Sequence, residues 1–269
     1  MDISIERSVK TNAQKLAVPS NRWLIPISAL MALAAWEGAV RWGNFPPFIL
    51  PSPARVWQRF LLALSDGTLL RNSATTLAEV MLGLLIGVCL AMIFGYLLAK
   101  SRLLERLLSP YLVASQAIPI VAIAPLLVIW FGPGMFSKVL ICALIVFFPV
   151  LVNTVVGLRA VPDNLRDLMC SMRATRLQML RYLEIPAALP VFLGGLRIGA
   201  TLSVIGAVVG EFVGADRGLG FLINVGRGQY DTALVFVAVF ALVNLALGLY
   251  GIVVLLEKRL LRWQNQKRK

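Results

Sequence analysis

The sequence predicts an all-α polytopic membrane protein with six transmembrane helices. The first observation is composition, because 59% of the residues are apolar and only 14% are charged, whereas soluble domains carry about a quarter charged residues. The second is that the apolar residues form six long runs, and a helix needs about 20 such residues to cross a bilayer. The third is that Lys and Arg gather in alternate connections, which places both termini in the cytoplasm.

These runs divide the chain into three parts. Residues 1–22 are a polar cytoplasmic tail, 23–256 a transmembrane domain, and 257–269 a basic cytoplasmic tail. The expected spans cover residues 23–42, 74–99, 111–131, 135–157, 189–213 and 232–256. Each boundary follows from a change between apolar and charged or turn-forming sequence.

The first span has tryptophans at both ends, Trp23 and Trp42, where such side chains anchor a helix at the interface. The Ala-Leu-Ala-Ala run at 32–35 could mimic a signal-peptidase site, but the apolar run continues past it into Trp36. Residues 44–66 are amphipathic and are expected to lie along the outer interface.

The second and third spans hold glycines and prolines with different expected uses. Gly83, Gly87 and Gly95 allow close helix packing. Lys100, Arg102 and Arg106 mark a short inside loop. In the third span Pro119 and Pro125 are expected to bend the helix, and Gln116 is a polar group near its start. A kinked helix could open carbonyls toward a path and act as a gate, or neighbouring helices could satisfy the kink.

The fifth span carries two ionisable residues, Arg197 and Glu211. Intramembrane charges face protein or water and often mark a transport path. They are fourteen residues apart, about 21 Å along a helix, so they cannot pair with each other. For Glu211 a structural partner such as Arg217 or Arg227 competes with a gate or substrate role.

The loop 159–190 is too regular to be a simple connector. Pro162 and Asp163 begin a helix, and the apolar residues that follow lie at the spacing of one helical face: Leu165, Leu168, Met169 and Met172. Thr175 and Gln178 form a capping box for a second helix, which Ile185-Pro186 is expected to end. This helix pair is either a docking surface for another protein or an interfacial pair held in the headgroups by its arginines.

Several function classes are excluded or disfavoured by what the sequence lacks. It contains no Gly-x-x-x-x-Gly-Lys phosphate loop and no histidine, and its three cysteines are scattered. The net charge of +13 lies mostly between apolar runs rather than in a separate basic domain, so binding to nucleic acid is not expected. The sequence therefore favours a chain with no catalytic, metal or cofactor site of its own.

The 159–190 loop resembles the cytoplasmic motif of permease subunits of binding-protein-dependent ABC importers. That motif reads Glu-Ala-Ala, three residues, Gly, nine residues, Ile, one residue, Leu-Pro. The matching residues here are Asp167, Leu168 and Met169, then Arg173, Leu183 and Ile185-Pro186. Arg173 replaces the motif glycine, so a left-handed residue there would be strained.

Other stretches resemble the nitrate, sulfonate, taurine and thiamine-precursor branch of these permeases. They are Phe48 to Pro53, SQAIPIVAIAPLLVIWFGPG in the third span and SVIGAVVGEFVGADRGLGFLI at the end of the fifth. The resemblance implies a type I importer permease fold in the bacterial inner membrane and a homodimeric pore. It also implies two ABC ATPase subunits that hold ATP and magnesium, and an extracytoplasmic solute-binding protein.

The resemblance also implies roles for individual residues. The ATPase-coupling surface would comprise Asp163, Arg166, Asp167, Leu168, Met169, Arg173, Thr175, Leu183 and Pro186, and the path or gate Gln116, Pro119, Pro125, Arg197 and Glu211. The Ser-Gln-Ala-Ile-Pro and Val-Ile-Gly-Ala stretches lean toward carriers of thiamine-precursor pyrimidines or riboflavin. A secondary transporter or channel is the alternative, although neither an inverted repeat nor mid-membrane coupling acids are evident; a membrane-embedded enzyme is a third.

Overall fold

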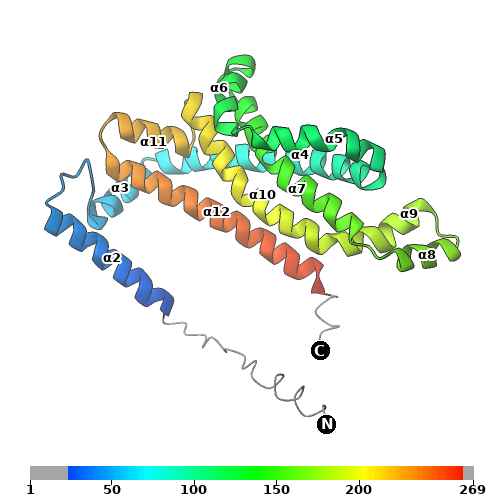
Figure 1. Cartoon of the computed structure of the whole chain (residues 1–269). Coiled ribbons are helices and arrows are strands. Elements are labelled where there is room, and N and C mark those ends of the chain that lie inside the picture. Colours follow the sequence, from blue (N-terminus) through cyan, green and yellow to red (C-terminus); the bar gives the residue numbers. More distant parts are fainter. Residues whose placement is uncertain (1–23, 263–269) are drawn as a thin grey trace, which may run out of the picture. The chain divides into compact units, whose positions relative to one another are not determined.

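The computed structural model describes residues 24–262, and within that range the secondary structure is entirely helical. The chain forms two compact units, residues 1–53 and 54–269, which are described separately. The described helices, labelled in Figure 1, are α2 (Leu24–Gly43), α3 (Pro53–Ser65), α4 (Thr68–Lys100), α5 (Arg102–Ala117), α6 (Ile120–Phe131), α7 (Met135–Arg159), α8 (Asp163–Ser171), α9 (Arg176–Met179), the π-helix η1 (Leu180–Glu184), α10 (Ile185–Gly214), α11 (Leu219–Gly228) and α12 (Thr232–Leu260). The polar tails expected at 1–22 and 263–269 lie outside the described residues.

In the first unit, α2 coincides with the predicted first span. Its Glu37 pairs with Arg41 one turn away, at 2.7 Å. The indole N–H of Trp36 donates to the carbonyl of Pro51, 3.1 Å away, and so ties the helix to the segment that follows it.

Four helical segments of the second unit are long and apolar enough to cross a membrane: α4, α7, α12 and the continuous segment Arg176–Gly214. The pair α5 and α6 would make a fifth span if it crosses as one bent segment. The α-helical membrane fold is confirmed. The structure supports four or five of the six predicted spans by length and composition, and α2 remains a predicted span.

Helix α7 lies between α4 and α10 and contacts both along most of its length. The approach is close because glycines face it: a Cβ at Gly87 would lie 2.7 Å from the Ala143 carbonyl oxygen, and one at Gly206 would lie 3.0 Å from Cys142 Cα. Small residues at such crossings allow backbones to approach, which is how helices gain packing energy in lipid. The close packing predicted for the α4 glycines is therefore confirmed.

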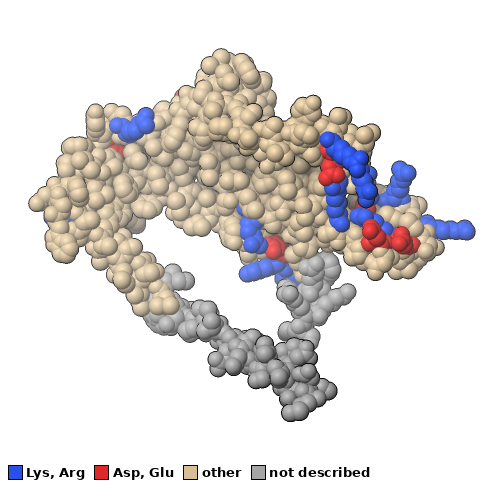
Figure 2. All heavy atoms as spheres, viewed as in Figure 1, with Lys and Arg blue, Asp and Glu red and all other residues tan. Residues whose placement is uncertain are grey.

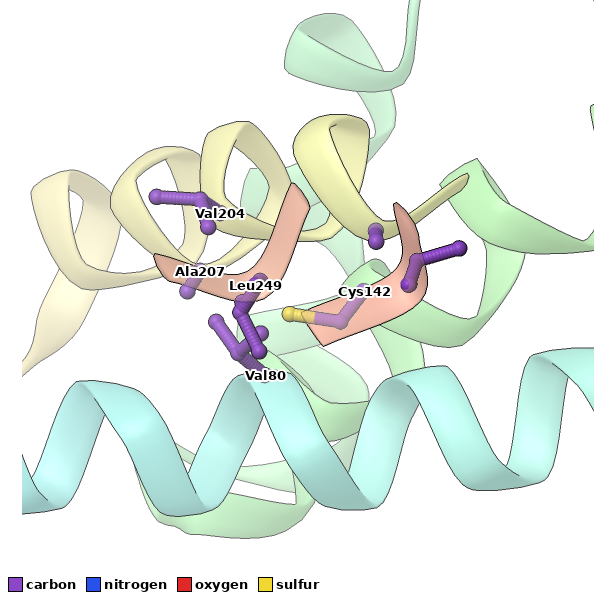
Figure 3. Close-up of a cluster of buried hydrophobic side chains, with 7 residues drawn as sticks. Val80, Cys142, Val204, Ala207 and Leu249 are labelled. Atoms are coloured by element: carbon purple, nitrogen blue, oxygen red, sulfur yellow. The ribbon is translucent and has the colours of Figure 1, made fainter. Parts of the chain in front are cut away.

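The buried centre of this packing joins four helices. Figure 3 shows Val80 of α4, Cys142 of α7, Val204 and Ala207 of α10, and Leu249 of α12 converging on one another. Their exposed fractions are all 6% or less. This cluster holds the helices that carry the polar groups at both ends of the unit.

The third predicted span is broken rather than gently kinked. Helices α5 and α6 meet at an angle of 93° across Ile118 and Pro119. Pro125, expected to add a second bend, lies inside α6 without interrupting it. The inside loop expected at 100–106 is reduced to Ser101, which caps α5, because Lys100 ends α4 and Arg102 already begins α5.

The predicted helix end at Ile185-Pro186 is wrong. Helix α9 passes through η1 directly into α10, giving one continuous 39-residue helical segment. A proline in a regular helix clashes with the carbonyl four residues earlier and removes one hydrogen bond. The wider π turn just before Pro186 changes that bonding pattern, so the helix continues.

Candidate functional site

The α8–α9 region exposes apolar side chains at one end of the second unit, called here the α8 end. Four of them form what we call the loop face: Leu165, Leu168, Met172 and Leu177, with exposed fractions of 40%, 57%, 70% and 72%. The predicted apolar face of α8 is therefore largely open, although Met169 is half-buried. Figure 2 shows acidic and basic side chains gathered around this end.

Helix α8 ends in a left-handed residue at the position that the sequence motif assigns to glycine. Arg173 has φ 52°. Its N–H donates to the Cys170 carbonyl at 2.9 Å, and the Ala174 N–H donates to the Met169 carbonyl at 3.0 Å. These two bonds form a Schellman cap, in which the C′ residue adopts the left-handed conformation. Arg173 thus adopts the left-handed conformation that the motif glycine would permit at little cost.

The second helix of the loop begins with the predicted capping box. The Gln178 N–H donates to Thr175 Oγ1 at 3.3 Å, and the Thr175 N–H donates to Gln178 Oε1 at 2.7 Å. At the start of α8, Arg166 pairs with Asp163 at 3.3 Å and donates to the Leu158 carbonyl at 2.9 Å. Asp167, considered as a partner of Arg166, is exposed. Both loop helices therefore have fixed starts.

Two ion pairs that the sequence reasoning missed attach this region to the spans. Lys100, at the end of α4, binds the buried Glu184 of η1 at 2.5 Å. Arg159, at the end of α7, binds both oxygens of Glu105 of α5 at 2.5 and 2.7 Å and also donates to the Leu98 carbonyl. The sequence does place these opposite charges beside the predicted cytoplasmic loops, and that placement could have predicted the pairs. The helix junctions at the α8 end are thereby fixed to one another.

Arg197 is held by another helix. Its guanidinium pairs with Glu257 near the end of α12 and lies over the Tyr250 ring, 5.5 Å from the centroid. The sequence analysis placed Glu257 in the basic tail and did not connect the two. The contacts give Arg197 a role in joining α10 to α12.

Glu211 lies at the opposite end of the unit, called here the α11 end, where it is 1% exposed. Its carboxylate accepts hydrogen bonds from Thr76 Oγ1 at 2.6 Å and from the Gly220 N–H at 2.5 Å. The latter belongs to the first turn of α11, where unpaired N–H groups favour an anion. These groups, rather than Arg217 or Arg227, are its partners.

The same end holds two buried charges that the sequence reasoning undervalued. Glu79 and Lys138 are each 2% exposed. Lys138 Nζ donates to the carbonyl oxygens of Gly214, at 2.8 Å, and Pro133. Beside them, Thr76 Oγ1 accepts from the Leu219 N–H at 2.8 Å. Helices α4, α7, α10 and α11 are joined through these polar groups, which lie far apart in the sequence.

The predicted path residues do not form one site. Gln116 borders a cleft of 170 Å³ between α5 and α7. Pro119 lies at the α5–α6 break, Arg197 of α10 pairs with Glu257 of α12, and Glu211 lies at the α11 end. The coupling residues, in contrast, are close in the chain: five lie on α8, Arg173 and Thr175 lie between α8 and α9, Leu183 lies on η1, and Pro186 lies at the start of α10.

Comparison with known proteins decides the family. Residues 83–262 match the family described as the binding-protein-dependent transport system inner membrane component. The chain belongs to this family. It is therefore an ABC importer permease, a multi-pass transport subunit of the inner membrane.

Curated relatives place this permease in the nitrate, sulfonate and taurine branch. It is 48% identical to the riboflavin transport system permease protein RibX of Chloroflexus aurantiacus, over 89% of this chain and 90% of that protein. It is 37% identical to the formylaminopyrimidine transport permease protein ThiX of Halalkalibacterium halodurans, over 88% and 94%. It is 30% identical to the taurine transport system permease protein TauC of Escherichia coli, over 99% of each.

Solved structures support the type I importer permease fold. A permease chain from the inward-facing MetNI methionine ABC transporter matches with a TM-score of 0.64 and 20% identity, over 73% of this chain and 97% of that chain. A chain of an amino acid ABC transporter solved with histidines matches with a TM-score of 0.59. The overall fold of this chain is thus a known permease architecture.

Proposed function

We propose that this permease moves a nitrogen heterocycle inward and that an ABC ATPase bound at the loop face drives it. The observation that carries the coupling is the combination of an exposed apolar face with a fixed mechanical connection. Leu168 and Met172 are exposed on α8, and the following helix runs without a break into α10. Force applied at the loop would reach a membrane-spanning helix directly.

The exposed apolar area favours protein docking over lipid headgroup binding. The residues next to the loop face include Asp163 and Asp167, both exposed on α8. An anionic headgroup layer repels these carboxylates, whereas a protein groove can accept an apolar helix face flanked by mixed charges. Docking of two ATPase subunits on two copies of this chain, with a solute-binding protein on the other side, is the arrangement that we propose.

The proposed substrate class rests on the relatives. The names of the relatives at 48% and 37% identity specify riboflavin and formylaminopyrimidine, and the relative at 30% is named for taurine. Both heterocycles carry N–H donors beside ring or carbonyl acceptors. We assign that chemical class to this permease, in agreement with the lean of its third and fifth spans.

The coupling proposal is tested in proteoliposomes that contain the complete importer. Asp167→Arg, or deletion of residues 167–173, is expected to abolish solute-stimulated ATP hydrolysis because either change alters the docked surface. Gln58→Arg, an exposed site on α3, is the matched control and should leave stimulation unchanged. The measurement is ATP hydrolysis with and without solute-loaded binding protein. Full stimulation in both α8 variants would remove the docking claim.

Whether transport requires the ATPase is measured in the same kind of vesicle. The permease alone should carry no riboflavin, formylaminopyrimidine or taurine, whereas the complete importer should accumulate one of the heterocycles only with internal ATP. Solute flux through the permease alone would support the alternative of a secondary transporter or channel.

A further inference from the structure

The α11 end contains a cleft of 550 Å³ beside the Glu211 network. Its polar border comprises Arg71, Thr75, Glu79, Lys138, Asp216 and Arg217. Pockets that hold small molecules are typically about 300–1,000 Å³ and combine apolar walls with a few convergent polar groups. Ala74, Ala78 and Met135 supply such walls here.

The two buried carboxylates of this region differ in their hydrogen bonding. Glu211 accepts from Thr76 and Gly220, and so has a donor for each oxygen. Glu79 is as deeply buried, but no donor among the described residues reaches its Oε2. An unpaired buried polar atom costs free energy, and few occur in native proteins. Because Glu79 borders the cleft, this is a carboxylate that a ligand can satisfy.

The cationic side chains near the cleft differ in what they contact. Lys138 donates to the carbonyls of Pro133 and Gly214. Arg71 and Arg217 are exposed at the border of the same cleft. The arrangement therefore presents an acceptor at depth and guanidinium donors at the opening. A solute that carries an N–H beside a carbonyl or ring nitrogen has the complementary pattern.

We propose that the cleft is a binding subsite for the transported solute, in which Glu79 accepts an N–H of the solute and Arg71 or Arg217 donates to its neighbouring acceptor. The subsite rests on the proposed function, because it identifies its ligand with the solute carried. Taurine shares part of the chemistry, through its ammonium and sulfonate groups, and forms a separate arm of the test.

Solute protection of a cysteine tests the subsite without altering Glu79. Thr75→Cys places a thiol on the cleft border, and Ser65→Cys on α3, which is exposed and does not line the cleft, provides a control, both in a Cys89→Ser/Cys170→Ser background. In the assembled importer, riboflavin or formylaminopyrimidine at ten times its dissociation constant should slow maleimide labelling of Thr75→Cys about ten-fold. Labelling of Ser65→Cys should not change.

Glu79→Gln supplies the functional measurement because it keeps the side chain's size and replaces one acceptor oxygen with an amide nitrogen. It should lower uptake of subsaturating heterocycle about ten-fold, because that nitrogen cannot accept the N–H of the solute. Basal ATP hydrolysis should persist. If uptake by the variant recovers at high solute concentration, the variant binds the solute more weakly but is correctly folded.

The outcomes separate this subsite from the proposed function. Normal heterocycle uptake by Glu79→Gln, with no protection of Thr75→Cys, would overturn the subsite and leave the transport function standing. Protection by taurine and not by a heterocycle would show that neither the subsite nor the importer is specific for heterocycles. No ATP-dependent uptake by the wild-type importer would overturn the proposed function, while the labelling would still decide whether the cleft binds the solute.

Discussion

Arg173 shows how one residue can conflict with the conformation that its position requires. It lies in the left-handed region, φ 52°, where it completes the Schellman cap of α8. A side chain with a Cβ costs about 1 kcal/mol or more there, whereas glycine does not. The cost is borne in the segment that we propose contacts the ATPase. The cap is therefore a weak point of this otherwise well-fixed loop.

Arg173→Gly is expected to stabilise the end of α8 by about 1 kcal/mol, because the backbone conformation is kept and its strain is relieved. Amide hydrogen exchange over residues 169–175 should slow about five-fold. Arg173→Ala removes the same charge but keeps a Cβ, and it should give no such protection. Equal exchange rates in the two variants would show that the left-handed residue is not strained.

Ion pairs at the residue scale connect helices that are distant in sequence. Lys100 binds Glu184, and Arg197 binds Glu257. Glu184 is buried, and a buried charge is normally paired, since removing its partner leaves it uncompensated. These pairs join η1 to α4 and α12 to α10. Their role is therefore to hold the helices together rather than to contact a solute.

At the scale of elements, the continuous helix from Arg176 to Gly214 is the main mechanical feature. It begins with the capping box of Thr175 in the loop and ends at Gly214, whose carbonyl accepts from Lys138. The π turn η1 lets the helix pass Pro186 without a break. An unbroken helix transmits rotation and displacement, whereas a flexible joint would absorb them.

Replacing Arg181 and Tyr182 by two glycines should weaken this transmission. Each glycine costs about 1 kcal/mol of helix stability relative to alanine. We expect solute-stimulated ATP hydrolysis to fall severalfold in the Gly-Gly variant, although the complex still assembles. The Ala-Ala variant loses the same exposed side chains and their cation–π contact, so it is the matched control. Equal stimulation in both would mean that the junction need not be rigid.

At the scale of the whole molecule, the second unit has two chemically different ends. The α8 end carries the loop face and surface ion pairs, and the α11 end carries buried carboxylates beside a cleft. Figure 1 shows α8 and α11 at opposite ends of the long helices. A transport subunit needs this difference, because energy and solute reach it from opposite sides of the membrane.

The proposed orientation places the exposed Cys170 of α8 in the cytoplasm. In a Cys89→Ser background, a membrane-impermeant maleimide should label inside-out vesicles and leave right-side-out vesicles unlabelled. Cys142 is buried and should not react in either. Labelling of Cys170 from the outside would reverse the topology and with it the proposed ATPase surface.

Sequence reasoning was reliable where a property depends on neighbours along the chain. Apolar runs predicted the helices α4, α7, α10 and α12, and Thr175 followed three residues later by Gln178 predicted the capping box. It erred at Pro125 and at Ile185-Pro186, because a proline's effect depends on the local hydrogen-bonding pattern. A π turn leaves no clear mark in the sequence.

The amino-acid sequence by itself determined the membrane-helical class and the family, and it identified the loop that we propose contacts the ATPase. Only the tertiary structure decided which charges meet: Arg197 with Glu257, Lys100 with Glu184, and Glu211 with Thr76 and Gly220. It alone showed that both oxygens of Glu211 accept hydrogen bonds, whereas Oε2 of Glu79 has no hydrogen-bond partner among the described residues. The physical reason is that helix formation and membrane partition are set by local composition, whereas pairing of buried polar groups depends on distances between helices far apart in the chain.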